Sequence, residues 1–140
     1  MSQVALITGA TSGFGAACAR LFAANGWRLV LCGRRLERLE ALRVELAGTV
    51  SVHAFALDVR DESAVNAALA ALPSAFADID VLVNNAGLAL GLEPAYQCDM
   101  EDWQRMIDTN IKGLLYCTRA ILPGMVARNR GHIVNIGSVA

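Results

Sequence analysis

The 140-residue sequence lacks several features that define whole classes of protein. Its formal net charge is only −1 and it contains a single lysine, Lys112, so nothing indicates nucleic acid as a partner. It has no run of about 18 apolar residues, the length that a membrane-spanning helix needs, so we expect no membrane association. The N-terminus enters an apolar segment without a preceding basic stretch, which argues against a secretory signal peptide.

Cysteine and histidine are sparse, and neither occurs at the spacing of metal ligands. The four cysteines are Cys18, Cys32, Cys98 and Cys117. They form no Cys-x-x-Cys pair, and we interpret them as reduced, packed thiols of a cytoplasmic protein. The two histidines, His53 and His132, lie far apart in the sequence. We therefore expect no metal site.

Apolar residues, in contrast, are abundant. They make up 55% of the chain. With glycine counted in place of tyrosine the share is about 62%, above the 45–50% of typical domains. This excess indicates either that the surface meets a partner or that part of the domain that would cover it lies outside this chain.

The most informative segment is the glycine-rich stretch that follows the apolar run 4–7. It contains Gly9, Thr11, Ser12, Gly13, Phe14 and Gly15. Its glycines are spaced G-x-x-x-G-x-G, a variant of the dinucleotide-binding fingerprint. Such a turn lets the backbone approach a pyrophosphate, and the helix after it directs N–H groups at the charge.

Strand-like and helix-like segments alternate along the whole chain. The predicted strands are 3–8, 28–32, 50–56, 81–83 and 132–136, and the predicted helices are 13–25, 36–46, 62–76 and 100–126. We expect Pro123 to break the last turn of the final helix. This order predicts an α/β fold, a doubly wound Rossmann-type parallel sheet with helices on both faces that stops after the fifth strand. Residues 1–140 would form one dinucleotide-binding domain.

Chemically informative residues follow the predicted strands. After the second strand come Gly33, Arg34 and Arg35, where a carboxylate would hold a ribose 2′-OH. Two arginines suit a 2′-phosphate instead, and therefore NADP. The alternative is a pair of solvated arginines that open a helix, a position that the helix dipole disfavours for cations.

The third and fourth strands are followed by two more candidate segments. Asp58 could accept from an adenine amino group while Val59 lines the ring, or Asp58 could be a helix or turn cap ahead of Glu62. The paired amides of the stretch Asn84, Asn85, Ala86 and Gly87 could bind neighbouring strand ends and leave room for a ribose, or they could form a plain turn.

Two further polar residues lie where a substrate could meet the cofactor. Asn110 interrupts the apolar stripe of the long predicted helix, so we expect a buried amide, either satisfied in the core or holding an active-site water. Ser138 follows the last strand and could be structural or could hydrogen-bond a carbonyl oxygen.

Together these residues resemble the short-chain dehydrogenase/reductase family, and the resemblance covers the whole chain. It implies that the first turn holds the pyrophosphate, that Asp58 and Val59 hold adenine, and that the stretch 84–87 lines the adenosine side. It also implies that Asn110 and Ser138 belong to a catalytic tetrad, and that the long helix 100–126 pairs with a second copy. The stretches 87–91, 108–110 and 135–138 look like the NADP-dependent 3-hydroxy acid dehydrogenase branch.

One family element is absent from the sequence. Tyr96 and Tyr116 are each followed four residues later by a residue other than lysine, so there is no Tyr-x-x-x-Lys pair. We therefore expect an oxidoreductase that moves a hydride between NADP(H) and a small hydroxy or keto substrate, of which this chain is the inactive cofactor-binding part. The alternative is a nucleotide-binding module without catalytic activity of its own.

Overall fold

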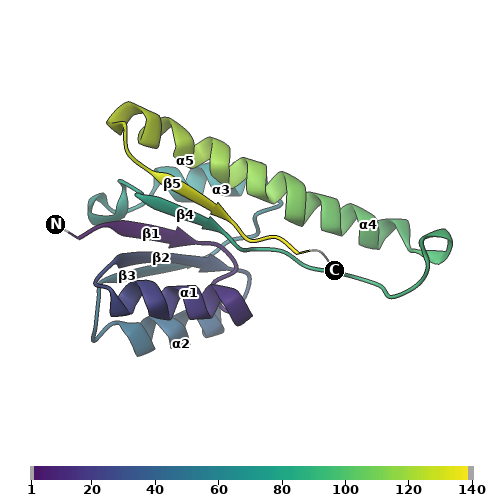
Figure 1. Cartoon of the computed structure of the whole chain (residues 1–140), viewed down its shortest axis with the longest axis horizontal. Helices are drawn as coiled ribbons and strands as arrows, with labels where there is room; N and C mark the ends of the chain where they lie inside the picture. The colour runs from purple at the N-terminus through teal and green to yellow at the C-terminus, as the bar shows by residue number, and fades with distance from the viewer. Residues whose placement is uncertain (1, 139–140) are drawn as a thin grey trace.

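The centre of the molecule is one parallel β-sheet, seen in a computed structural model that describes residues 2–138 (Figure 1). Its five strands lie in the order β3-β2-β1-β4-β5. They are β1 (Val4–Ile7), β2 (Arg28–Gly33), β3 (Val52–Ala56), β4 (Val81–Asn84) and β5 (His132–Asn135). Every neighbouring pair is parallel, which confirms the predicted sheet. The strand order reverses between β1 and β4, where sheets of this type bind ligands at the carboxyl ends.

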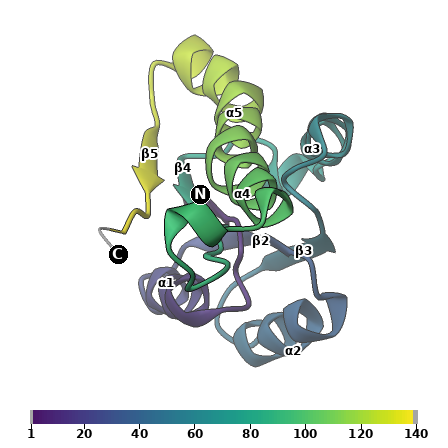
Figure 2. The same cartoon turned by 90° about the vertical axis from the view of Figure 1, so that its right-hand side faces the viewer.

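Helices cover both faces of the sheet, as a doubly wound fold requires (Figure 2). One face carries α1 (Gly13–Ala24) and α2 (Leu36–Leu46). The other carries α3 (Glu62–Ala70) and a long helical path made of α4 (Met100–Met106), the π-helix η3 (Ile107–Gly113) and α5 (Leu114–Arg128). Two short 3-10 helices, η1 (Ser74–Phe76) and η2 (Ala95–Gln97), lie in the connections.

The core forms two layers because alternate side chains of each strand point to opposite faces. From β1, Val4 and Leu6 join the layer under α3 and α5, while Ala5 and Ile7 join the layer under α1 and α2. Each fully buried Leu or Ile in these layers contributes about 1.5–3 kcal/mol. The central strands thereby fix the strand ends that carry the polar residues.

Three predicted elements differ from the structure by two residues or more, and the other differences are of one residue. The helix predicted over 62–76 ends at Ala70, because Pro73 has no N–H and disfavours a helical conformation for the residue before it. Pro123 does not break the long helix: α5 continues to Arg128 while Ile121 and Met125 anchor it in the core. The third strand starts at Val52 rather than at Val50, because the Val50 N–H donates to the Leu46 carbonyl at the end of α2.

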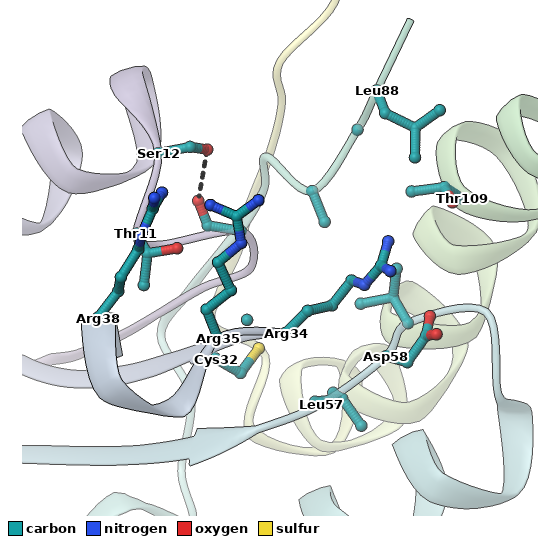
Figure 3. Close-up of a pocket in the computed structure, with 15 residues that line it drawn as sticks. Thr11, Ser12, Cys32, Arg34, Arg35, Arg38, Leu57, Asp58, Leu88 and Thr109 are labelled. Atoms are coloured by element: carbon teal, nitrogen blue, oxygen red, sulfur yellow. Dashed lines mark hydrogen bonds between the residues drawn. The ribbon is translucent and has the colours of Figure 1, made fainter. Parts of the chain in front are cut away.

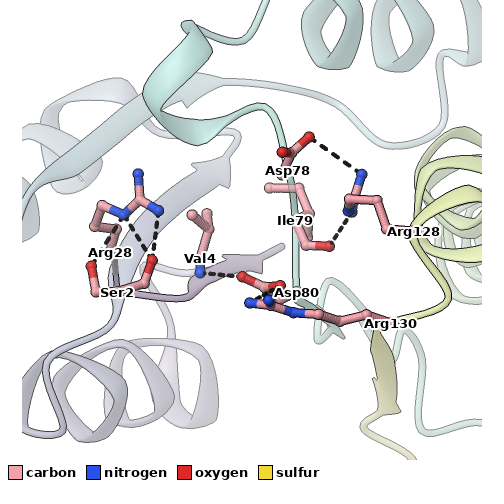
Figure 4. Close-up of polar contacts among 8 residues, drawn as sticks. All are labelled: Ser2, Val4, Arg28, Asp78, Ile79, Asp80, Arg128 and Arg130. Carbon is pink, nitrogen blue, oxygen red and sulfur yellow. Dashed lines mark hydrogen bonds and ion pairs between the residues drawn. The ribbon is translucent and has the colours of Figure 1, made fainter.

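A polar network ties the amino ends of the strands together (Figure 4). The buried Asp80 accepts from the Val4 N–H at 2.9 Å and pairs with Arg130 at 2.7 Å. One carboxylate therefore links β1, β4 and the turn before β5. This edge lies opposite the carboxyl ends and stabilises the register of the central strands.

Candidate functional site

A cavity of about 260 Å³ opens at the carboxyl ends of the strands (Figure 3). Nine of the residues predicted for cofactor binding line it: Gly9, Thr11, Ser12, Arg34, Arg35, Asp58, Val59, Ala86 and Gly87. Six further residues complete the lining: Cys32, Gly33, Arg38, Leu57, Leu88 and Thr109. The predicted strand-end residues therefore come together in one place.

Two glycines at the turn after β1, Gly9 and Gly15, have no room for a side chain. Gly9 has a φ of +59°, and a Cβ there would lie 2.8 Å from the backbone of Ala86. A Cβ on Gly15 would lie 2.3 Å from the Gly9 carbonyl oxygen. The turn is also tied to β4, because the Thr8 hydroxyl accepts from the Asn85 N–H at 3.0 Å. Its backbone is therefore held open toward the cavity.

Five predicted residues lie beside the cavity rather than lining it. Gly13, Phe14 and Gly15 begin α1, and Phe14 is 73% exposed. Asn84 and Asn85 use their amides to bind neighbouring strand ends. Asn84 donates to the Asn135 side chain at 3.0 Å and Asn85 donates to the Gly9 carbonyl at 2.9 Å.

Two arginines follow β2 and reach different ends of the cavity. In Figure 3, Arg34 extends toward Asp58 and Arg35 extends toward the turn that carries Ser12. The Ser12 hydroxyl donates to the Gly9 carbonyl at 3.3 Å, which holds it at the rim. Both arginines are exposed and line the cavity, and Arg35 is also the residue that precedes α2.

A third arginine, Arg38, also lines the cavity, and sequence reasoning missed it. It lies in α2, three residues after Arg35. Residues three apart on a helix share a face, so this spacing could have identified it.

The carboxylate of Asp58 is held by its neighbour Arg60. Arg60 donates to it from Nε at 3.0 Å and from the guanidinium NH₂ at 2.6 Å, and its backbone N–H adds a bond of 3.0 Å. The Arg60 hydrogen bonds, with a weaker contribution from the charge of Arg34, hold the pKa of Asp58 below its ordinary value. The cap of α3 is Asp61, which accepts from the Ala64 N–H, so Asp58 is not the helix cap. Asp58 does cap the turn before α3, because its carboxylate accepts from the Arg60 N–H two residues later.

Asn110 lies in η3 and is exposed, so the expectation of a buried amide was wrong. Its side chain is nevertheless satisfied, because it accepts from the Leu88 N–H at 2.9 Å and donates to the Leu88 carbonyl at 2.8 Å. This pair of bonds fixes the segment after β4 against the long helix. Ser138 is exposed and lies three residues beyond β5.

The long helix meets the cavity closely at one glycine. A Cβ on Gly113, at the end of η3, would lie 2.5 Å from the Val59 side chain. Thr109, one helical turn earlier, lines the cavity. Single-turn π-helical insertions are frequent at functional sites, and this one brings the helix against the Asp58–Val59 loop.

The described residues contain neither a metal-binding cluster nor a membrane-spanning helix. Within residues 2–138, no group of three or more His, Cys, Asp or Glu side chains could hold a metal ion. Over the same residues, no helix is both long and apolar enough to cross a membrane.

Comparison with known families identifies the class of protein. The short chain dehydrogenase family model matches residues 3–140. This match covers nearly the whole chain, and it agrees with the sheet order and the strand-end cavity. The chain belongs to the short-chain dehydrogenase family.

Individual relatives show which members of this family the chain is similar to. The chain is 59% identical over 138 residues to an NADP-dependent 3-hydroxy acid dehydrogenase of Salmonella typhi, covering 99% of this chain and 55% of the relative. It is 57% identical to a sulfoacetaldehyde reductase of Chromohalobacter salexigens, covering all of this chain and 56% of the relative. The closed form of a serine dehydrogenase complexed with NADP⁺ superposes with a TM-score of 0.93 at 53% identity, covering 98% of this chain and 54% of the other. The chain thus spans about half the length of the curated relatives it matches.

Proposed function

We propose that the natural protein carrying this chain is an oxidoreductase that transfers a hydride between NADP(H) and a small hydroxy or carbonyl substrate, with 3-hydroxy acids as the first candidates. The observation that carries the proposal is the cavity itself, in which Gly33 ends β2 and Arg34 and Arg35 follow it. Residues 1–140 would form its dinucleotide-binding domain. The NADP-dependent relatives support this assignment.

The residues present fit the cofactor. No side chain caps the N-terminus of α1, so its first N–H groups are available to the pyrophosphate beside the open turn at Gly9 and Gly15. Arg34 and Arg35 would bind the 2′-phosphate. Asp58 would accept from the adenine amino group while Val59 lines the ring.

The remaining side of the adenosine pocket would come from the segment after β4. Ala86 and Gly87 line the cavity and leave room for a ribose, while Asn84 and Asn85 act by holding the strand ends. Gly13 and Phe14 would contribute backbone at the start of α1.

When bound, NADPH supplies the hydride. Ser138 would donate a hydrogen bond to the substrate oxygen and orient it. The Asn110 amide uses one N–H and one oxygen lone pair in its hydrogen bonds to Leu88. Its other N–H and lone pair would bind a water molecule in a proton relay. Neither side chain is a good proton donor near neutral pH, so we assign the general acid to a residue outside this chain.

The second candidate is a nucleotide-binding module without chemistry of its own. The absence of a Tyr-x-x-x-Lys pair from the sequence favours it for residues 1–140 alone. General acid catalysis contributes about 10²–10⁴-fold, so the isolated chain should show no meaningful turnover.

An NADPH-consumption assay separates the two candidates. It compares the full-length natural protein with residues 1–140, on a panel of 3-hydroxy acids and their carbonyl partners. We expect turnover only from the full-length protein, and Ser138→Ala should lower kcat far more than it weakens NADPH binding. Robust turnover by residues 1–140 would overturn the assignment of the general acid, and an unchanged kcat in Ser138→Ala would leave that serine a structural role.

We also propose that the protein is a homo-oligomer that pairs through residues 100–126. Large apolar side chains remain exposed along this path: Met100, Trp103, Ile107, Ile111, Leu115, Leu122 and Val126. Sedimentation velocity should show dissociation of Leu115→Glu. The matched control Val44→Glu, which also places a charge on an exposed apolar position but in α2, should keep the oligomer. A wild-type monomer at high concentration would refute the pairing.

We further propose that the protein works in the cytoplasm. All four cysteines of the chain are free thiols, two of them buried, which suits a reducing compartment. Localisation of the tagged full-length protein by cell fractionation tests this, and recovery from the periplasmic or secreted fraction would contradict it.

A further inference from the structure

Arg38 differs from most basic side chains in the described part of the chain in having no hydrogen-bond or ion-pair partner. Among residues 2–138, seven basic side chains have an ion pair or a hydrogen bond, but Arg34, Arg35 and Arg38 have none. Arg38 also lines the groove between α1 and α2, where the lining includes the carboxylate of Glu45. Arg20 already holds Glu45 with bonds of 2.7 and 3.1 Å.

The position of Arg38 adds charge where a helix tolerates it least. Arg34 and Arg35 precede α2 and Arg38 lies in its first turn, and the only acid in that turn is Glu37. The N-terminal end of a helix carries partial positive charge. Three cations there repel one another and interact unfavourably with the helix dipole. An anion of high charge, bound among them, would relieve this cost.

The cavity shows where that anion would lie. Arg38 lines the cavity together with Thr11 and Ser12 of the turn after β1. Figure 3 shows Arg35 and Arg38 extended toward this turn, whereas Arg34 extends away from it toward Asp58. The guanidinium groups of Arg35 and Arg38 therefore flank the side of the cavity where β2 ends at Gly33, not the side of Asp58.

We propose that Arg38 is a further specificity-determining residue, which joins Arg35 on one side of the 2′-phosphate of NADP(H) while Arg34 reaches this phosphate from the Asp58 side. The proposal rests on the proposed function, because it takes NADP(H) as the cofactor. A phosphate monoester carries close to two negative charges and three acceptor oxygens, which matches two forked donors rather than one.

The test measures binding rather than turnover, in the full-length natural protein. Titrations compare adenosine 2′,5′-bisphosphate with adenosine 5′-monophosphate, two ligands that differ only in the 2′-phosphate. Arg38→Ala should weaken the bisphosphate about tenfold or more and change the monophosphate less than twofold. Arg38→Lys, which keeps the charge but not the fork, should fall between wild type and Arg38→Ala. Arg43→Ala removes the same charge from the same helix at a residue paired with Glu40, outside the cavity, and should change neither affinity.

Each other outcome overturns the proposal in a distinct way. If Arg38→Ala weakens both ligands equally, Arg38 contacts the 5′-phosphate or supports the fold, and thermal unfolding without ligand separates these two roles. If Arg38→Ala retains the wild-type preference for the bisphosphate, the Arg38 assignment fails while the proposed cofactor stands. If the wild-type protein itself shows no preference for the bisphosphate, the NADP(H) assignment fails and the Arg38 proposal fails with it.

Discussion

Replacing Gly33 with aspartate should invert the nucleotide preference of the protein that carries this chain. Gly33 ends β2, and a Cβ built on it would lie 3.8 Å from both the Thr11 hydroxyl and the Leu39 side chain, which is ordinary van der Waals contact. A Cβ therefore fits at this position without displacing the backbone, beside the cavity that Gly33 lines. The new carboxylate would occupy the place where an acid accepts from a ribose 2′-OH.

The expected magnitude follows from two opposing effects on the two nucleotides. Two unit charges about 5 Å apart repel by about 3 kcal/mol at an effective dielectric constant of 20, so the carboxylate disfavours the 2′-phosphate of NADPH. A hydrogen bond from the 2′-OH of NADH to the carboxylate contributes about 1.5–3 kcal/mol. Arg34 and Arg35 remain and offset part of the repulsion. At 1.4 kcal/mol for each factor of ten, the ratio of the two affinities should change about 100- to 1,000-fold.

The assay is fluorescence titration of the full-length protein with NADPH and with NADH at two salt concentrations. Gly33→Ala is the matched control, because it adds the Cβ without the charge, and it should keep the wild-type preference. The NADPH preference of the wild type should also decrease as salt screens the arginines. The reasoning would be refuted if Gly33→Asp kept the wild-type ratio within about threefold, or if Gly33→Ala changed it as much.

Three further predictions concern the packing and ionisation of the site. Gly113→Ala would place a Cβ 2.5 Å from the Val59 side chain, so urea unfolding should show a loss of about 1–3 kcal/mol together with weaker nucleotide binding. The control Gly48→Ala, whose Cβ meets nothing within 4 Å, should do neither. A neighbouring guanidinium lowers the pKa of Asp58 from 3.8, so this carboxylate stabilises the fold above that pH, and the stabilisation is lost as pH falls through the lowered pKa. Asp58→Asn should therefore make the free energy of unfolding depend less steeply on pH below about pH 4. The change should be small because the pair is partly exposed. The same pH dependence in the variant and the wild type would contradict this prediction. Burial raises the pKa of the Cys117 thiol to about 11, so maleimide at pH 8 should leave this thiol unmodified in the native protein. Peptide mapping measures the labelling. Labelling of the native protein as fast as that of the protein in urea would contradict the prediction.

The helix boundaries show where local sequence patterns are sufficient and where they fail. The start of α1 and the end of β2 follow from glycines and apolar runs, which act over a few residues. Pro73 ends a helix and Pro123 does not, although both sit in helical patterns. The difference is that α5 is anchored in the core on both sides of Pro123, and packing of that kind is not visible in the local sequence.

The sequence by itself determined the alternation of strands and helices, and with it which residues follow each strand. In a parallel sheet the carboxyl ends share one edge, so the glycine-rich turn, Arg34, Asp58 and Gly87 had to meet there once the pattern was identified. Those inferences depend on short apolar runs and on a period of 3.6 residues, both of which can be read along the chain.

Only the tertiary structure decided how these residues are partnered. It showed that Arg60 holds Asp58, that Asn110 bonds to Leu88 in an exposed position, and that Arg38 lines the cavity. Partners of this kind depend on which elements pack together and at what distance. Side-chain direction and long-range packing are set by the whole fold, because the chain segments that meet at the cavity are separated by tens of residues in the sequence.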